Sequence, residues 1–322
     1  MKQKITVLGD GAWGTAIAHT LATAKNSVTL WCYDATVAQD ITSSRENKKY
    51  LPDIKIHSNV IPTMSLEQAL DARIIFVAIP VAFLRNTLMQ CMPYTTQQQS
   101  WVFLSKGIEQ NTLAVSSTIA QETVNPTTWA VLAGPSYARD LAQNQITGFT
   151  YAGKSPEFLH MLKTLFPSFC TFEYSNDTQG IQLYGALKNI LALGIGIIEG
   201  AGYTDNTKAL FFTRVFNEIT LLIEASDGNK NSYARFAGIG DALLSGYGAL
   251  SKNKKLGLLL GSGKSMLEAL KEFSTPPEGV NTIKSAQQLI MQKQIATPLL
   301  ETLYNYVQGT ADLPALIHAL IA

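Results

Sequence analysis

Lys188 stands almost alone among apolar and small residues. It is the single charged residue of the stretch 179–198, QGIQLYGALKNILALGIGII. Apolar residues recur in this stretch at intervals of three and four: Ile181, Tyr184, Leu187, Leu191 and Ile195. This spacing predicts a buried helix that is apolar nearly all round. A buried ammonium group is costly without a partner, and burial lowers the pKa of an amine. Lys188 is therefore a candidate proton donor or acceptor; the alternative is a lysine that reaches the surface along its aliphatic stem.

Two groups of polar residues downstream suit the same chemistry. Residues 232–250 are apolar and glycine-rich, and Asp241 is their one acid, a natural partner for a buried lysine. An exposed loop aspartate is the alternative. Directly after this segment come Ser251, Lys252, Asn253, Lys254 and Lys255. In a nearly neutral chain this basic run predicts a binding point for one phosphate group, although most such runs are merely solvated.

A glycine motif near the start of the chain predicts a dinucleotide site. Residues 4–8 indicate a short buried strand, and an alanine-rich helix follows it. Gly9, Gly11 and Gly14 lie between them with G-x-G-x-x-G spacing. Gly9 permits the tight turn, Gly11 lets backbone amides approach a pyrophosphate, and Gly14 lets the helix pack closely on the strand. The alternative is a simple tight turn, which the context of strand, turn, helix and second strand disfavours.

The second strand, 27–34, ends in an acid. Asp34 is placed to accept a hydrogen bond from the ribose 2′-hydroxyl of NAD. Its neighbour Tyr33 is neutral, so the local sequence offers no positive charge for the 2′-phosphate of NADP.

Strands and helices alternate through the first half of the chain. Further apolar strands are predicted at 73–79, 101–105, 128–133, 146–153 and 169–175, which gives a sheet of about eight strands. Lys106 and the segment 134–136 directly follow two of these strands, at the sheet edge where ligands bind in a parallel doubly wound fold. Taken alone, Lys106 is more readily a solvated loop charge.

The second half of the chain shows helical patterns only. One of the predicted helices, near 206–225, carries Arg214 and Glu218 with the spacing of an i,i+4 ion pair. The sequence therefore predicts an α/β protein with an N-terminal doubly wound, Rossmann-like, mostly parallel sheet and an all-α C-terminal domain. The expected domains are a dinucleotide-binding domain at 1–180 and a helical substrate-binding domain at 181–322.

Composition limits the class of protein. With 322 residues, 46% of them hydrophobic and 15% charged, the chain is an ordinary folded protein of about two domains. A net charge of +1 provides no general attraction for nucleic acid or a membrane surface. The cysteines, Cys32, Cys91 and Cys170, form neither a metal motif nor a disulfide framework, which favours a reducing cytoplasm. We expect no signal peptide, no metal site, and no segment that approaches the roughly 20 apolar residues needed to span a bilayer.

Together these segments resemble the bacterial type of NAD(P)-dependent glycerol-3-phosphate dehydrogenase over nearly the whole chain. The matching segments follow in the family's order: GDGAWGTAIA, NKKYLPDI, SKGIE, AGPSYARD, GALKN with NTKALFFTR, GIGD, SKNKKLG and PEG. An ordered series with compatible spacing is much more specific than the glycine motif alone. The resemblance implies a cytoplasmic homodimer that uses NAD or NADP and supplies glycerophospholipid synthesis.

The resemblance also assigns roles to residues. Lys188 and Asp241 are implied as catalytic, with Lys188 as the general acid/base. The residues implied around the substrate are Lys106, Gly134, Ser136, Lys188, Asn189, Asp241, Ser251, Lys252 and Asn253. Those implied around the cofactor are Gly9, Gly11, Ala12, Trp13, Gly14, Tyr33, Lys106, Ala138, Lys252 and Glu278. The family normally has arginine where Lys252 stands, so a two-pronged grip on phosphate is replaced by a point charge.

The expected reaction is the reduction of dihydroxyacetone phosphate to sn-glycerol 3-phosphate. Lys188 would stabilise the charge that develops on the carbonyl oxygen and donate a proton to it, while Asp241 orients the lysine. Lys252 and Asn253 would hold the phosphate. Two alternatives are a reductase of another small phosphorylated or carboxylated carbonyl compound, and a nucleotide-binding regulator without turnover.

Overall fold

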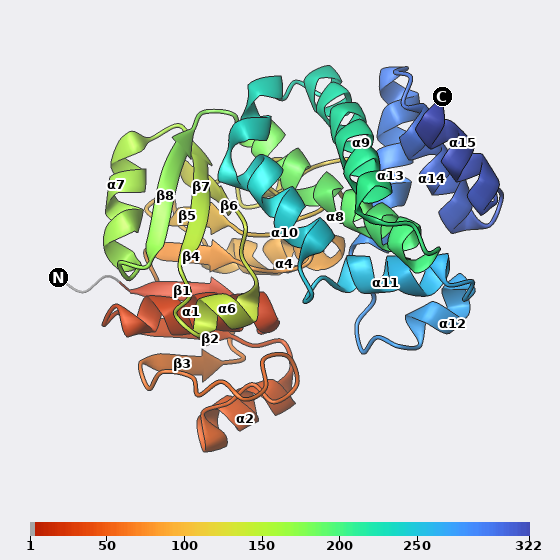
Figure 1. Cartoon of the computed structure of the whole chain (residues 1–322). Coiled ribbons are helices and arrows are strands. Elements are labelled where there is room, and N and C mark those ends of the chain that lie inside the picture. Colours follow the sequence, from red (N-terminus) through yellow and green to blue (C-terminus); the bar gives the residue numbers. More distant parts are fainter. Residues whose placement is uncertain (1–3) are drawn as a thin grey trace. The chain divides into compact units, whose positions relative to one another are not determined.

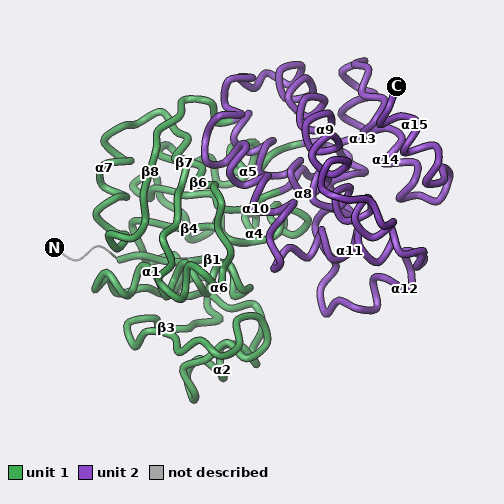
Figure 2. Tube along the Cα trace, viewed as in Figure 1, with its two compact units in different colours: residues 1–106, 114–178 green, residues 107–113, 179–322 purple. Residues whose placement is uncertain are grey.

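The computed structural model describes residues 4–322 and divides into two compact units (Figure 2). Unit 1 covers the chain up to Lys106 together with Ala114–Thr178, and unit 2 combines Gly107–Leu113 with Gln179–Ala322. The units differ from the predicted functional domains chiefly in residues 107–113, which pack within unit 2. There the buried Ser285 hydroxyl donates a hydrogen bond of 3.1 Å to the carbonyl oxygen of Ile108.

Unit 1 is built on an eight-stranded sheet with the strand order β3-β2-β1-β4-β5-β6-β7-β8 (Figure 1). The strands are β1 (Ile5–Leu8), β2 (Val28–Trp31), β3 (Val60–Thr63), β4 (Ile74–Val77), β5 (Ser100–Phe103), β6 (Thr128–Ala133), β7 (Thr147–Gly153) and β8 (Cys170–Ser175). All neighbours from β3 to β6 are parallel, β7 is antiparallel to β6, and β8 is parallel to β7. This topology confirms the predicted Rossmann-like, mostly parallel sheet. Its strand order reverses between β1 and β4, which is where such sheets bind ligands.

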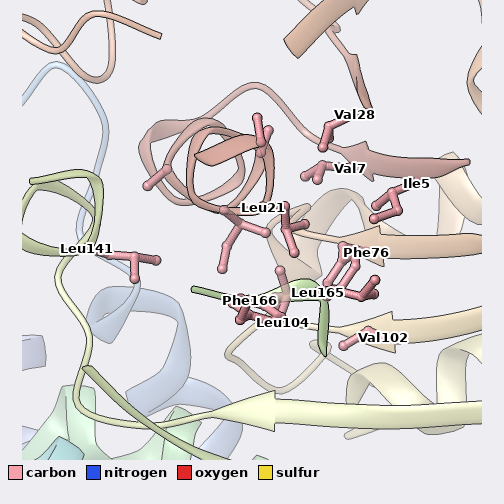
Figure 3. Packing of buried hydrophobic residues seen from close by; sticks show 14 of the residues in the cluster. Ile5, Val7, Leu21, Val28, Phe76, Val102, Leu104, Leu141, Leu165 and Phe166 are labelled. Atoms are coloured by element: carbon pink, nitrogen blue, oxygen red, sulfur yellow. The ribbon is translucent and has the colours of Figure 1, made fainter. Parts of the chain in front are cut away.

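Helices of unit 1 connect these strands. They are α1 (Ala12–Thr23), α2 (Ala35–Ser44), α3 (Leu66–Leu70), α4 (Val81–Cys91), the 3₁₀ turn η1 (Met92–Tyr94), α5 (Ser116–Glu122), α6 (Ala138–Ala142) and α7 (Pro156–Leu165). Every residue of β1 and of β4 is buried, which explains why both strands are continuously apolar. Figure 3 shows part of the core: Leu21 of α1 and Val7 of β1 lie in the same cluster as Phe76, Leu165 and Phe166.

Unit 2 is helical. Its elements are α8 (Thr178–Gly200), α9 (Asp205–Ala225), the short turns η2 (Lys230–Ala234) and η3 (Phe236–Gly240), α10 (Asp241–Tyr247), α11 (Lys252–Gly261), α12 (Met266–Leu270), α13 (Gly279–Lys293), α14 (Pro298–Gln308) and α15 (Leu313–Ile321). Arg214 and Glu218 of α9 do not pair with each other as predicted. Arg214 donates to the carbonyl oxygen of Leu320, and the Glu218 carboxylate accepts from the first backbone N–H groups of α14. Both charges therefore satisfy backbone groups at buried helix ends, which sequence spacing does not reveal.

Helix α8 is buried continuously from Gly180 to Ile198, as its apolar sequence predicts. By length and composition it is able to cross a membrane, which corrects the expectation that no segment approaches that length. Its apolar window is wholly buried inside the protein, as in the core helix of a soluble protein. Among residues 4–322 it is the one such candidate, and this is weak evidence for a membrane span.

Glycines bring α8 and α11 into backbone contact. A Cβ added at Gly196 of α8 would lie 2.9 Å from the Cα of Gly257 of α11, and one added at Gly257 would lie 2.8 Å from the Cα of Gly196. One turn further along, added Cβ atoms at Gly200 and Gly261 would collide with backbone of the opposite helix. Because α8 carries Lys188 and α11 begins at Lys252, this glycine contact fixes the start of α11 relative to Lys188.

His19 is a buried histidine of α1 whose neighbours require it to be neutral. The backbone N–H of His57 donates to its Nδ1 at 3.1 Å, so that nitrogen carries no proton. Burial and the nearby His57 lower the pKa of His19, and a hydrogen bond with the backbone of Ala142 opposes them in part. The unfolded chain therefore binds a proton at this site more readily than the folded protein does.

We expect acid to destabilise the fold through His19. Its stabilising contribution is complete above the ordinary histidine pKa of 6.5 and is lost as pH falls from there toward the lower folded-state pKa. In His19→Gln, which stays neutral, the free energy of unfolding in urea should fall less between pH 7.5 and pH 5.5 than in the wild type. His160→Gln, on the exposed face of α7, is the control. Equal pH dependence in wild type and His19→Gln would contradict the interpretation.

The glycine contact between α8 and α11 gives a second prediction. Gly257→Ala should lower the free energy of unfolding by about 1–3 kcal/mol, because the added methyl group has no space and the helices must separate. Ser262→Ala, at the exposed end of α11, should change it by less than about 0.5 kcal/mol. Urea unfolding followed by circular dichroism measures both. A Gly257→Ala protein as stable as wild type would show that α11 adjusts freely.

Candidate functional site: a dinucleotide turn and a buried lysine

The glycine turn after β1 has the geometry of a dinucleotide site. Gly9 has φ +115°, and a Cβ there would lie 2.7 Å from the carbonyl oxygen of Ala78. A Cβ at Gly14 would collide with the carbonyl oxygen of Gly9. At Gly11, by contrast, an added Cβ would meet nothing within 4 Å, and no side chain caps the N-terminus of α1. The first N–H groups of α1 therefore face open space where a phosphate group fits.

Trp13 supplies an independent sign of a missing partner in the same turn. Its indole Nε1–H is buried and, among the residues that the structure describes, has no hydrogen-bond acceptor. Buried donors are rarely left unpaired, so an oxygen of a bound ligand is the natural acceptor. Ala12 and Trp13 open α1 directly after Gly11, as the cofactor prediction requires. The residues present thus fit a dinucleotide.

Asn47 braces this turn, a role that sequence reasoning missed. Its side chain is fully buried, and its Nδ2 donates to the carbonyl oxygen of Asp10 and to the hydroxyl of Thr15, each at 2.8 Å. Its Oδ1 accepts from the backbone N–H of Tyr50 at 3.0 Å. The one available signal was local: Asn47 precedes Tyr50 by three residues, and asparagine side chains often close turns of this kind.

The end of β2 carries more charge than its local sequence predicts. Tyr33 is 82% exposed. Asp34 caps the N-terminus of α2, where its carboxylate accepts from the backbone N–H of Thr36 at 2.8 Å. Lys49 donates to the other oxygen of the same carboxylate at 2.7 Å, and this hydrogen bond lowers the pKa of Asp34. The expectation of no positive charge beside Asp34 was therefore wrong: Lys49 comes from a separate loop.

The carboxyl ends of β5 and β6 bring together three residues predicted around the substrate. Lys106 Nζ and the Ser136 hydroxyl both donate to the carbonyl oxygen of Gly134, at 3.4 Å and 3.0 Å. Gly134 has no room for a side chain, since an added Cβ would collide with the carbonyl oxygen of Gly148. Ala138, predicted at the cofactor, is the first residue of α6 and packs partly against the core of unit 1.

In unit 2, Lys188 and Asp241 form a buried ion pair. Lys188 Nζ donates to Asp241 Oδ1, and the side chains are 9% and 0% exposed. Asp241 is the first residue of α10 and follows a distorted turn in which Gly238 has φ −85° and ψ −107°. A Cβ at Gly238 would meet backbone atoms of Tyr233, so this glycine lets the chain bend and deliver the carboxylate to Lys188.

A chain of hydrogen bonds joins the predicted residues next to this pair. The backbone N–H of Gly279 donates to Asn253 Oδ1 at 2.9 Å, and Asn253 Nδ2 donates to Asn189 Oδ1 at 2.9 Å. Asn189 Nδ2 then donates to Glu278 Oε2 at 3.3 Å. Because a backbone N–H only donates, it fixes the orientation of Asn253 and hence of Asn189. Each amide keeps a second N–H with which to bind an anion.

The basic run at the start of α11 is divided among different partners. Ser251 caps the helix by accepting from the N–H of Lys254. Lys254 pairs with Glu199 at 3.1 Å, and Lys255 lies 5.2 Å from the centre of the Phe273 ring. Lys252 is exposed and forms no ion pair with any residue that the structure describes. Lys252 is therefore the lysine of this run best placed to meet a phosphate.

Electrostatics around Glu199 shows why Lys254 is held. Burial would raise the pKa of the Glu199 carboxyl, but hydrogen bonds from Lys254 and Lys208 overcome this and lower it. The carboxylate is thereby kept ionised and keeps Lys254 on α8. Within residues 4–322, no group of three or more His, Cys, Asp and Glu side chains is arranged to hold a metal ion.

Comparison with known proteins agrees with both halves of this arrangement. Residues 4–159 match the family model for the N-terminus of NAD-dependent glycerol-3-phosphate dehydrogenase, and residues 177–318 match the model for its C-terminus. The glycerol-3-phosphate dehydrogenase [NAD(P)+] of Carboxydothermus hydrogenoformans is 37% identical over 306 residues, covering 94% of this chain and 91% of that protein. The corresponding protein of Bacillus subtilis is 34% identical, covering 99% and 94%.

A solved structure gives the same answer for the fold. The crystal structure of glycerol-3-phosphate dehydrogenase from Coxiella burnetii superposes with a TM-score of 0.95 at 25% identity, covering 100% of this chain and 99% of that one. The sequence matches, the glycine turn with its unpaired indole, and the buried lysine with its carboxylate all lead to one conclusion. This chain belongs to the NAD-dependent glycerol-3-phosphate dehydrogenase family.

Proposed function

We propose that this protein reduces dihydroxyacetone phosphate to sn-glycerol 3-phosphate with NADH or NADPH, and that Lys188 is its proton donor. The observation that carries the proposal is the buried ion pair of Lys188 and Asp241 beside the polarised amides of Asn189 and Asn253. A charged amine is kept in an apolar helix only when something offsets the cost of its burial. Asp241 does so by accepting a hydrogen bond from the ammonium group.

Lys188 acts on the carbonyl oxygen. As the carbonyl carbon is reduced, negative charge develops on this oxygen, and the ammonium group stabilises it more strongly than it stabilises the neutral ketone. Lys188 then transfers a proton to the oxygen, which gives the secondary alcohol, and the neutral amine recovers a proton from solvent. Asp241 favours the ammonium form before each turnover and fixes the direction of its N–H bonds. In the reverse reaction Lys188 accepts the proton.

The phosphate group is held away from the reacting carbon. Lys252 provides an exposed positive charge, and Asn253 and Asn189 provide the N–H groups that their own hydrogen-bond chain leaves available. Binding energy from the phosphate positions the carbonyl group without entering the chemical step. Lys252 makes a point contact where a guanidinium would make two parallel hydrogen bonds, so we expect a higher KM than an arginine at this position gives.

The cofactor is held by unit 1. Gly9, Gly11 and Gly14 would leave room for the pyrophosphate, to which the first N–H groups of α1 and the Trp13 indole would donate, and Asp34 would accept from the adenosine ribose. When bound, the reduced dinucleotide supplies the hydrogen and the electron pair that the carbonyl carbon takes up.

Further expectations concern the cell. All three cysteines are free and buried, and burial raises the pKa of the Cys32 thiol to about 12. Buried, protonated thiols are poorly suited to disulfide formation, which supports a reducing cytoplasm. We propose a cytoplasmic homodimer that feeds glycerophospholipid synthesis. The alternative of a different carbonyl substrate is separated by one screen: dihydroxyacetone phosphate should be reduced at least about tenfold more efficiently than dihydroxyacetone or a 2-keto acid, measured as kcat/KM.

The proton donor is tested by Lys188→Met. We expect kcat to fall by about 10²–10⁴-fold while the Kd for NADH stays within about twofold, because Lys188 acts in the chemical step. Steady-state rates and a fluorescence titration of NADH measure the two. The double variant Lys188→Met/Asp241→Asn removes the unpaired buried carboxylate and guards against loss through misfolding. Lys230→Met, an exposed lysine of the same unit, is the control.

One result would remove the mechanism. If Lys188→Met retains kcat within about tenfold of wild type, the proton donor lies elsewhere. If wild type binds NADH but reduces none of the ketones, the chain is the nucleotide-binding regulator that the sequence left open.

A further inference from the structure

The loop after α2 delivers Lys49 to the end of β2. Asn47 fastens this loop to the glycine turn, so the position of Lys49 is set by the same contacts that brace Asp10 and Thr15. Lys49 then donates to Asp34 at 2.7 Å, and its Nζ lies 5.1 Å from the centre of the Tyr50 ring. The lysine is therefore held at a defined place beside the acid.

Other basic residues nearby are engaged elsewhere. Arg45 donates to the backbone carbonyl groups of Ile56, His57 and Val60, Lys48 pairs with Asp40, and Lys55 pairs with Glu46. Among the described basic residues of this loop, Lys49 is the one that pairs with Asp34. The side chains of Lys49 and Asp34 are 52% and 22% exposed, so the ammonium group can turn to a second anion while the carboxylate keeps contact with water.

The pair can serve two kinds of ribose. The Asp34 carboxylate has about four acceptor positions. Thr36 occupies one on Oδ1 and Lys49 one on Oδ2, which leaves room for a ribose hydroxyl donor without displacing the lysine. A 2′-phosphate is different: it only accepts hydrogen bonds at neutral pH and brings up to about two negative charges.

Without Lys49 this end of the site would repel a 2′-phosphate. Asp34 is a carboxylate, and its own backbone N–H donates to the Asp10 carboxylate at 2.9 Å, so two acids lie close together. Burial raises the pKa of Asp10, with the hydrogen bond from Asp34 acting in the opposite direction. Lys49 is thus the group that offsets one of these two negative charges.

We propose that Lys49 determines cofactor specificity: it stays on Asp34 when NAD presents its 2′-hydroxyl, and it moves to the phosphate when NADP presents its 2′-phosphate. This inference rests on the dinucleotide site of the proposed function. It gives Lys49, in the 47–51 loop, a role that Asp34 alone does not fill: the binding of NADP as well as NAD.

The test measures nucleotide binding in the complete protein with no ketone present. NADH, NADPH, 5′-ADP and 2′,5′-ADP are titrated by fluorescence and calorimetry against wild type, Lys49→Met and Asp34→Asn. Lys48→Met is the matched control, because Lys48 is the adjacent lysine of the same loop and pairs with Asp40 instead. Methionine keeps the unbranched stem of lysine, and asparagine keeps the helix cap at position 34.

Lys49→Met should weaken binding of NADPH and 2′,5′-ADP at least about tenfold, the usual loss for one charge-assisted hydrogen bond, and change NADH and 5′-ADP less than about twofold. Asp34→Asn should shift the ratio the opposite way, with tighter NADPH and weaker NADH binding. Lys48→Met should leave both within about twofold. Equal losses for both cofactors in Lys49→Met, an unchanged ratio, or no binding of 2′,5′-ADP to wild type would overturn the proposal.

These outcomes are independent of catalysis. If the nucleotides bind as expected and no ketone is reduced, the proposed reaction fails while the role of Lys49 stands. If ketone reduction proceeds with NADPH and Lys49→Met leaves the Kd ratio of the two cofactors unchanged, the reaction stands and the role of Lys49 fails.

Discussion

The buried contact between Lys188 and Asp241 constrains the rest of unit 2. Two opposite charges in an apolar interior lower the energy of the fold only when they meet with good geometry, and removing either one leaves an uncompensated charge. The bend at Gly238 delivers the acid, and the glycine contact between α8 and α11 fixes where the start of α11 lies along α8. The surroundings of the Lys188 ammonium group thus depend on how closely the backbones of α8, α11 and the bend at Gly238 are able to approach one another.

Unit 1 contains an ion pair of the opposite character. Asp34 and Lys49 are about as close as a hydrogen bond allows, yet both reach solvent, so water screens their attraction and the pair contributes little to stability. Separating the buried Lys188–Asp241 pair would leave uncompensated charge in the interior, whereas the members of an exposed pair can turn to water. The same chemical groups are therefore held in one arrangement in unit 2 and are exposed to other partners in unit 1. Burial, more than distance, separates these two roles.

Much of this architecture could be predicted from periodicity. The apolar strands, the glycine turn and the long buried helix each have a local signal. Asp241 could be matched to Lys188 because Lys188 is the one charged residue of its segment and Asp241 is the one acid of its own. Partners supplied by distant loops could not be predicted. Lys49 reaches Asp34 because Asn47 fastens its loop. Arg214 and Glu218 form their hydrogen bonds with backbone groups at the ends of α15 and α14 instead of with each other. The spacing of residues along one helix or strand predicts contacts within that element. It does not predict which distant loop will pack against the element.

The membership of residues 107–113 in unit 2 affects how this chain can be handled and how it matures. The polypeptide leaves unit 1 after Lys106, contributes Ile108 to unit 2, returns at Ala114 and leaves again after Thr178. The carbonyl oxygen of Ile108 accepts a hydrogen bond from the hydroxyl of Ser285, which lies 177 residues later in the chain. The helical unit therefore lacks this internal hydrogen bond until residue 285 has been synthesised. A gene fragment that starts at residue 179 would omit this heptapeptide, and circular permutation or fusion at that junction would have to carry it along as a separate insert.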